Sequence, residues 1–230
     1  MPVDPIAEIE ITAFKWVPPF AEGLVRDLRI RWALEEIGRP YRVRLLDATN
    51  PRPEAYFAEQ PFGQVPAYRD REVQLFESGA ILIHLGLSDE RLLPTDANGR
   101  GRAIAWLIAA LNSVEPMLFE LGNIDLFNKD AAWAIERRPE VVEKVQGRLK
   151  LLADALGEQD WFEGRFTIGN LMIASVLRNV RHTDLVAEQP RLRAFLDRSE
   201  ARPAFQRALA DQCVPFQQNQ PDNQPQGAAA

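Results

Sequence analysis

The sequence predicts an α/β domain followed by an all-α domain. Three observations lead to this expectation: a strand, helix, strand pattern opens the chain, a polar segment with a proline occupies 88–100, and apolar residues from about 101 to 211 recur only at helical spacing. With 230 residues and 46% apolar content, the chain is long enough for two cores. We expect domains at 1–87 and 101–216, a linker at 88–100, and a disordered tail at 217–230, which lacks large apolar residues.

The first half of the chain alternates strands with helices. Residues 9–15 predict a strand, residues 24–37 carry an apolar helical stripe that stops at Gly38, and residues 41–46 alternate as a second strand. This order favours parallel pairing through a right-handed crossover. The remaining expected elements are a short helix near 53–59, strands at 66–68 and 73–76 around a turn at 69–71, and a helix at 78–87.

Charge and composition argue against several classes of partner. The 27 basic and 33 acidic residues give a net charge of −6, which predicts neither nucleic-acid nor membrane binding. One cysteine, Cys213, excludes an intramolecular disulfide framework, and the chain start lacks a secretory pattern, so we expect a cytoplasmic protein. The longest apolar run, 103–111, is shorter than the roughly 18 residues of a membrane span. No metal site is expected.

Two neighbouring motifs carry the functional signal. The stretch PFGQVP at 61–66 precedes an expected strand, and the pair Glu77-Ser78 opens the next expected helix. A proline cannot donate to a sheet, so Val65-Pro66 suits a strand start, an edge, a bulge or a cis peptide. Taken singly, Val65-Pro66 could be an ordinary turn and Ser78 only a helix cap.

In combination with the element order, these motifs resemble the cytosolic glutathione S-transferases. The segment 31–43 is similar to that family's first helix and second strand, and the segment 166–177 to the buried helix of its second domain. The resemblance extends to about residue 211. It implies a thioredoxin-like N-terminal domain, an all-helical C-terminal domain, glutathione as substrate and a homodimer.

The resemblance also implies a glutathione site. Val65, before a cis Pro66, is expected to pair its backbone with the cysteinyl unit of glutathione like an added strand. The helix start at Ser78 is expected to hold the γ-glutamyl carboxylate, and Glu77 the ammonium group.

Three further positions complete the expected binding surface. Gln64 stands where many relatives have lysine, so Arg52 becomes a candidate partner of the glycyl carboxylate. Trp16 and Trp106 fall where family members line the acceptor pocket.

The usual catalytic position is atypical. The family places a Tyr, Ser or Cys between the first strand and first helix, but residues 13–31 contain no Tyr, Ser, Thr or Cys. Thr12 and Arg26 are the candidates that the sequence offers, whereas Arg29 matches a position that is often basic for structural reasons. Two functions stay open: a transferase acting on a small hydrophobic electrophile or a disulfide, or a glutathione-binding or protein-interaction relative with little or no catalysis.

The segment FTIGNL at 166–171 predicts a helix start. Thr167 is expected to be the N-cap, with Asn170 three residues later and Phe166 with Leu171 as a hydrophobic staple. The family usually has Asp where Asn170 stands, so we expect the cap to keep a hydrogen bond and lose a charge.

Overall fold

The computed structural model describes residues 2–221. Contacts divide the chain into an N-terminal unit, Met1–Ile81 with Gln206–Ala230, and a helical unit, Leu82–Phe205. The C-terminal segment thus returns to the N-terminal unit, which the sequence pattern did not indicate, and the domain boundaries expected from the linker stay a prediction. Helix α8 (Pro203–Gln218) extends two residues into the tail expected at 217–230, of which residues 222–230 lie outside the described part.

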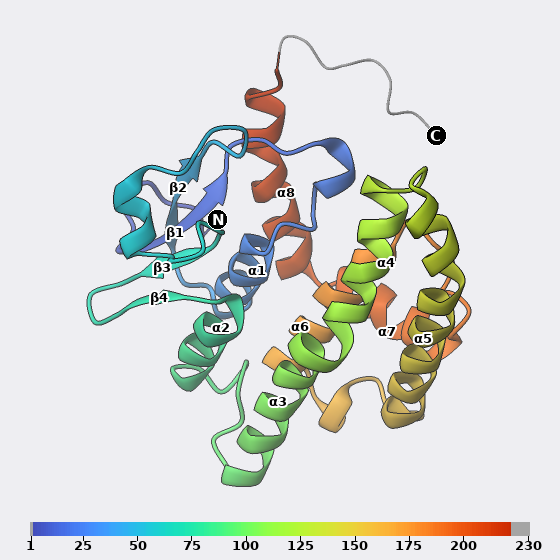
Figure 1. Ribbon diagram of the computed structural model, residues 1–230. Helices are drawn as coiled ribbons and strands as arrows, with labels where there is room; N and C mark the ends of the chain where they lie inside the picture. The colour runs from blue at the N-terminus through green and yellow to red at the C-terminus, as the bar shows by residue number, and fades with distance from the viewer. Residues whose placement is uncertain (1, 222–230) are drawn as a thin grey trace. The chain divides into compact units, whose positions relative to one another are not determined.

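A four-stranded mixed sheet forms the centre of the N-terminal unit (Figure 1). Strands β1 (Ile9–Phe14) and β2 (Tyr41–Leu46) are parallel, while β3 (Ala67–Arg69) is antiparallel to both β1 and β4 (Gln74–Phe76). The order β2-β1-β3-β4 confirms the predicted thioredoxin-like arrangement, in which a βαβ unit is followed by a hairpin.

Helix α1 (Asp27–Ile37) joins the two parallel strands. It begins three residues later than the sequence suggested, because residues 22–26, which follow the 3₁₀ turn η1 (Pro19–Ala21), form turns and a bend instead of helix. The helix ends where predicted, at Gly38, whose φ of 63° suits a residue without a side chain. Figure 1 shows α1 on one side of the sheet and the short helix η2 (Glu54–Ala58) on the other.

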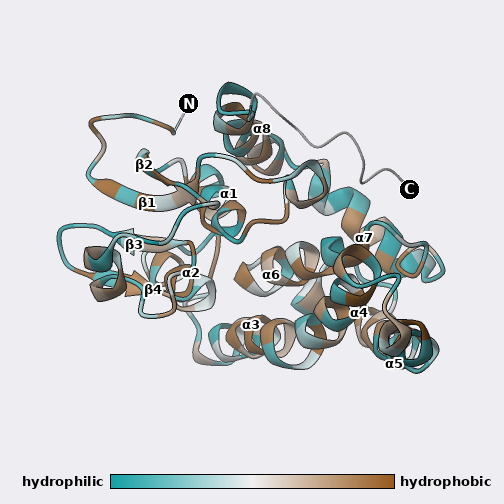
Figure 2. Cartoon of the chain, turned by 45° about the horizontal axis from the view of Figure 1, so that its top comes forward, coloured by the Kyte–Doolittle hydropathy of each residue, from teal (hydrophilic) through white to brown (hydrophobic). Residues whose placement is uncertain are grey.

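The helical unit contains only helices among its described residues, as predicted. They are α3 (Ala97–Ala109), the π segment η3 (Ala110–Val114), α4 (Glu115–Phe127), α5 (Ala132–Leu156), η4 (Phe162–Gly164), α6 (Ile168–Leu177), η5 (Arg178–Val180) and α7 (Pro190–Glu200). Helix α6 is buried along nearly its whole length and packs on α3 and α7 (Figure 2). An apolar helix enclosed on all sides is the usual core of such a unit.

The start of α6 differs in detail from the expectation. Thr167 is the N-cap, as predicted, and accepts from the N–H of Gly169 at 3.2 Å. Asn170 is fully buried, and its amide nitrogen donates to Oγ1 of Thr167 at 3.2 Å, so the cap keeps a hydrogen bond, as expected. The same nitrogen also donates to the carbonyls of Phe162 and Arg165, and the amide oxygen accepts from the Phe162 N–H, bonds that a capping box does not contain. The Asn170 amide therefore makes hydrogen bonds that an ionised carboxylate at this position could not make, because a carboxylate has no hydrogen to donate.

The helices α3, η3 and α4 form one continuous helical run, Ala97–Phe127, longer than the nine-residue apolar stretch noted in the sequence. By length and composition alone this run could cross a membrane. Packing of α3 on α6 and of α4 on α5 buries part of this run, including Leu107, Leu118 and Leu121, whereas Ile108 and Phe119 are exposed.

Candidate functional site

The Val65–Pro66 segment enters β3 directly, and its peptide bond is cis, as the resemblance implied. Val65 is 6% exposed, and its side chain lies in a cluster with Leu46, Tyr56 and Ala67. Among residues 2–221, neither the N–H nor the C=O of Val65 has a hydrogen-bond partner. Buried backbone groups without partners are rare in folded proteins, so this pair of groups suits a ligand that presents its own backbone.

Thr12 lies beneath this segment and is 1% exposed. Its hydroxyl accepts from the N–H of Ala67 at 2.7 Å and lies 2.8 Å from the hydroxyl of Tyr56. The Thr12 side chain is thus engaged inside the protein, an arrangement that does not favour its predicted catalytic role, which stays a prediction.

Ser78 is the first residue of α2 (Ser78–Leu87) and is 3% exposed. Its hydroxyl oxygen accepts from Nη1 of Arg29 at 3.1 Å, so its hydrogen is left to donate. Arg29 is itself 3% exposed. A helix N-terminus backed by a buried guanidinium attracts an anion, because both carry positive charge.

Glu77 precedes this helix with a φ of 69°, and its carbonyl accepts from the N–H of Ile81. Within residues 2–221, Glu77 and Glu163 are the two non-glycine residues with positive φ. Such strain is concentrated at functional sites when the surrounding structure maintains it. The carboxylate of Glu77 is exposed, as a ligand contact requires.

Gln64 and Arg52 flank the same loop. Gln64 is exposed, and its carbonyl accepts from the hydroxyl of Tyr56 at 2.6 Å. The guanidinium of Arg52 donates to the carbonyls of Asp47, Asn50 and Gly63 and lies 4.7 Å from the ring centre of Phe14. Nε and Nη1 of Arg52 therefore stabilise the loop, and Nη2 has no hydrogen-bond partner within the described residues.

The segment between β1 and α1 is where the resemblance implies a catalytic side chain, and it offers backbone N–H groups. The N–H of Leu24 already donates to the carbonyl of Ala21 at 3.0 Å, whereas that of Val25 has no partner in the described part of the chain. Arg26 is the half-buried N-cap residue of α1 and makes no side-chain capping bond. Trp16, between β1 and η1, is half-buried.

In the helical unit, Trp106 lines a cavity of about 250 Å³ with Arg102, Ala105 and Ala109. Its indole N–H donates to Oε1 of Glu163 at 2.8 Å, and Nη2 of Arg102 donates to the same oxygen at 2.6 Å. The bond from Arg102 is the main reason that the pKa of Glu163 is lowered. A charged carboxylate therefore fixes the Trp106 ring at the cavity wall.

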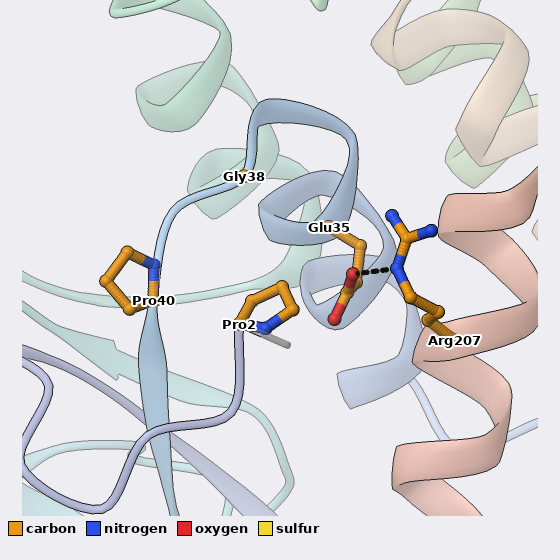
Figure 3. Close-up of a pocket in the computed structure, with 5 residues that line it drawn as sticks. All are labelled: Pro2, Glu35, Gly38, Pro40 and Arg207. Carbon is orange, nitrogen blue, oxygen red and sulfur yellow. Dashed lines mark hydrogen bonds and ion pairs between the residues drawn. The ribbon is translucent and has the colours of Figure 1, made fainter.

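A larger cavity of about 380 Å³ lies in the N-terminal unit and contains none of the predicted site residues. Pro2, Glu35, Gly38, Pro40 and Arg207 line it, and Figure 3 shows Glu35 of α1 facing Arg207 of α8. Their ion pair measures 2.6 Å. Burial nevertheless raises the pKa of Glu35, with Arg207 acting in the opposite direction. The pair connects the C-terminal helix to α1.

Sequence reasoning missed three participants. The Tyr56 hydroxyl contacts Thr12 across 44 positions and Gln64 across eight. Arg29 contacts Ser78 across 49 positions, and Glu163 contacts Trp106 across 57 positions. His182 lies 3.2 Å from Asp125, a carboxylate that Arg138 also binds. Within residues 2–221, no group of three or more His, Cys, Asp or Glu side chains could hold a metal ion.

Comparison with known proteins gives a consistent result. Residues 20–86 match the family model described as the glutathione S-transferase N-terminal domain. A glutathione S-transferase-like protein of Aspergillus fumigatus is 26% identical over 213 residues, 84% of this chain and 94% of that protein. A glutathione transferase of Burkholderia graminis, crystallised with two glutathione molecules per subunit, superimposes with a TM-score of 0.77 at 26% identity, covering 88% of this chain and 87% of that chain. A Pseudomonas fluorescens family member has a TM-score of 0.78 at 24% identity, covering 87% and 92%.

Proposed function

Since the chain belongs to the glutathione S-transferase family, we propose that it binds glutathione and activates its thiol for a small hydrophobic electrophile or for thiol-disulfide exchange. The observation that carries this proposal is the buried Val65, whose N–H and C=O have no partner among residues 2–221. These two groups suit the C=O and N–H of a cysteinyl unit.

The start of α2 suits the γ-glutamyl end of the tripeptide. The Ser78 hydroxyl, supported by Arg29, donates to the γ-glutamyl α-carboxylate together with the first N–H groups of the helix. The exposed carboxylate of Glu77 lies next in sequence and binds the ammonium group. The carboxylate and the ammonium group of the γ-glutamyl end would thus each face a group of opposite charge.

The glycyl carboxylate is assigned to Arg52 and Gln64. Most of the Arg52 guanidinium is used to brace the loop, so only Nη2 is offered to the ligand. The amide of Gln64 adds a neutral donor. This end of glutathione should accordingly contribute less to affinity than the γ-glutamyl end.

Thiol activation is assigned to the backbone before α1. A free thiol has a pKa of about 8.5, and lowering it by one unit requires about 1.4 kcal/mol of preferential thiolate stabilisation. A helix N-terminus supplies about 0.3 to 1 kcal/mol and up to about 2 in partly buried settings. Since the N–H of Leu24 is already bonded, the N–H of Val25 becomes the candidate donor, with Arg26 as the nearby cation.

The second substrate is assigned to the cavity at Trp106, whose indole face offers an apolar wall. The acceptor-pocket role expected of Trp16 stays a prediction. A small planar electrophile could pack against this apolar wall. A disulfide substrate would not require the cavity, because it would react with the activated thiol directly.

A second function is favoured by one specific observation, the absence of Tyr, Ser, Thr or Cys at residues 13–31. A glutathione-binding or protein-interaction relative with little catalysis would need the Val65 and Ser78 contacts but no thiol activation. We also propose a homodimer in the cytoplasm, which light scattering and cell fractionation would test.

Two measurements separate these functions. Retention on immobilised glutathione tests binding, and conjugation of glutathione to 1-chloro-2,4-dinitrobenzene, with a parallel disulfide-exchange assay, tests catalysis. Retention with turnover supports the transferase, and retention without turnover supports the binding relative. Failure of calorimetry to detect glutathione binding would refute both.

Ultraviolet titration of the bound thiolate then tests the mechanism. We expect a thiol pKa below that of free glutathione, and Arg26→Ala should raise it while leaving affinity nearly unchanged. An unaltered pKa in this variant would assign activation to the backbone alone.

A further inference from the structure

Three hydrogen bonds form a continuous chain around the Val65–Pro66 segment. The N–H of Ala67 donates to Oγ1 of Thr12 at 2.7 Å, this oxygen lies 2.8 Å from Oη of Tyr56, and Tyr56 donates to the carbonyl of Gln64 at 2.6 Å. A tyrosine hydroxyl has one hydrogen, and a carbonyl can only accept. Tyr56 therefore donates to Gln64, and Thr12 must donate to Tyr56.

The last bond fixes the peptide group that carries the N–H of Val65. The carbonyl of Gln64 and the N–H of Val65 belong to one planar trans peptide, so they point in opposite directions. Holding the carbonyl against Tyr56 directs the N–H of Val65 away from the network. At the other end, the bond from Ala67 to Thr12 holds the peptide that follows Pro66.

Burial makes these restraints effective. Thr12 and Tyr56 are 1% and 2% exposed, so little water can replace a lost bond. The Tyr56 side chain also packs against Val65 and Ala67. Burial raises the pKa of Tyr56, so its hydroxyl keeps the donated hydrogen at neutral pH.

We propose that Tyr56 and Thr12 are positioning residues that hold the backbone of Val65 ready for a peptide ligand. This inference rests on the proposed function, since the ligand is glutathione. Neither side chain touches glutathione: Tyr56 acts through the Gln64–Val65 peptide, and Thr12 acts by orienting Tyr56.

The experiment compares hydroxyl deletions with a matched control. Tyr56→Phe and Thr12→Val remove links of the chain, Thr12→Ser keeps the hydroxyl, and Tyr68→Phe removes another buried tyrosine hydroxyl, which bonds Asp70 at 2.7 Å. Glutathione affinity is measured by calorimetry in folded protein, and stability by urea denaturation.

We expect Tyr56→Phe and Thr12→Val to weaken glutathione binding by about 3- to 10-fold, the range set by a net hydrogen-bond contribution near 1 kcal/mol. Thr12→Ser should restore most of the affinity. Tyr68→Phe should lower stability with unchanged affinity. In ¹⁵N-labelled protein, glutathione should shift the Val65 amide resonance strongly in wild type and weakly in Tyr56→Phe.

The outcomes are distinguishable. Wild-type protein that does not bind glutathione overturns the proposed function, and the positioning role falls with it. Wild-type binding with equal affinity in Tyr56→Phe and Thr12→Val overturns the positioning role alone. If Tyr56→Phe does not fold, the difference between Thr12→Val and Thr12→Ser decides, because equal affinities of these two variants also refute the inference.

Discussion

Replacing Ser78 by alanine tests the anion end of the site. The hydroxyl is 3% exposed, accepts from Arg29 at 3.1 Å and keeps its hydrogen for a ligand. A hydrogen bond to a charged group contributes about 1.5 to 3 kcal/mol. Loss of the bond to the γ-glutamyl carboxylate should therefore weaken glutathione binding roughly 10- to 150-fold.

Stability must be separated from binding in this variant. Arg29 loses one buried acceptor, which should lower the free energy of unfolding by about 1 to 3 kcal/mol. Ser199→Ala is the matched control, because Ser199 is fully buried and its hydroxyl donates to the carbonyl of Phe195 at 2.8 Å in the helical unit. It should lower stability and leave glutathione affinity unchanged.

Titration calorimetry at a temperature where both variants are folded gives the decisive comparison. A Ser78→Ala protein that binds glutathione as tightly as Ser199→Ala would remove Ser78 from the site. The helix N-terminus would then be the remaining source of attraction for the carboxylate.

Three further changes have defined outcomes. Asn170→Asp should lower the free energy of unfolding in urea by about 1 to 3 kcal/mol, since a carboxylate cannot donate the bonds that the amide nitrogen makes to Phe162, Arg165 and Thr167; an unchanged midpoint would refute this. Glu163→Gln should loosen Trp106 and raise KM for the electrophile roughly threefold, with KM for glutathione as the internal control. Burial raises the pKa of Asp211, so its charge destabilises the fold at pH 7 and ceases to do so as the pH falls through the folded pKa. Asp211→Asn should therefore gain up to about 1 kcal/mol at pH 7, a gain that shrinks toward pH 4 and is absent from the exposed control Asp130→Asn.

The order of secondary structure could be predicted from local pattern. Strand alternation at 41–46, the stop at Gly38 and the N-cap at Thr167 all depend on residues within one or two turns, and the structure contains each of them. The start of α1 differs from the prediction by three residues, because apolar spacing alone does not reveal the turns at residues 22–26.

The candidate ligand residues were also accessible from sequence, through the resemblance of the Val65–Pro66 and Glu77–Ser78 motifs to a known family. The expected roles of these residues depend on their backbone groups, and a short motif such as Val65–Pro66 can be recognised in the sequence. Their supporting partners could not be found in this way. Arg29 was interpreted as structural, and its bond to Ser78 became visible only in three dimensions.

Local patterns in the sequence predict where strands and helices form and which short motifs suit a peptide ligand. The side chains that hold those motifs in place emerge only from the folded chain. Thr12, Tyr56 and Ala67 come from different elements, and a hydroxyl has no periodicity that reveals a partner 44 or 55 positions away. Hydrogen bonds of this kind depend on distance and angle in space, and the folded sheet is what brings their donors and acceptors together.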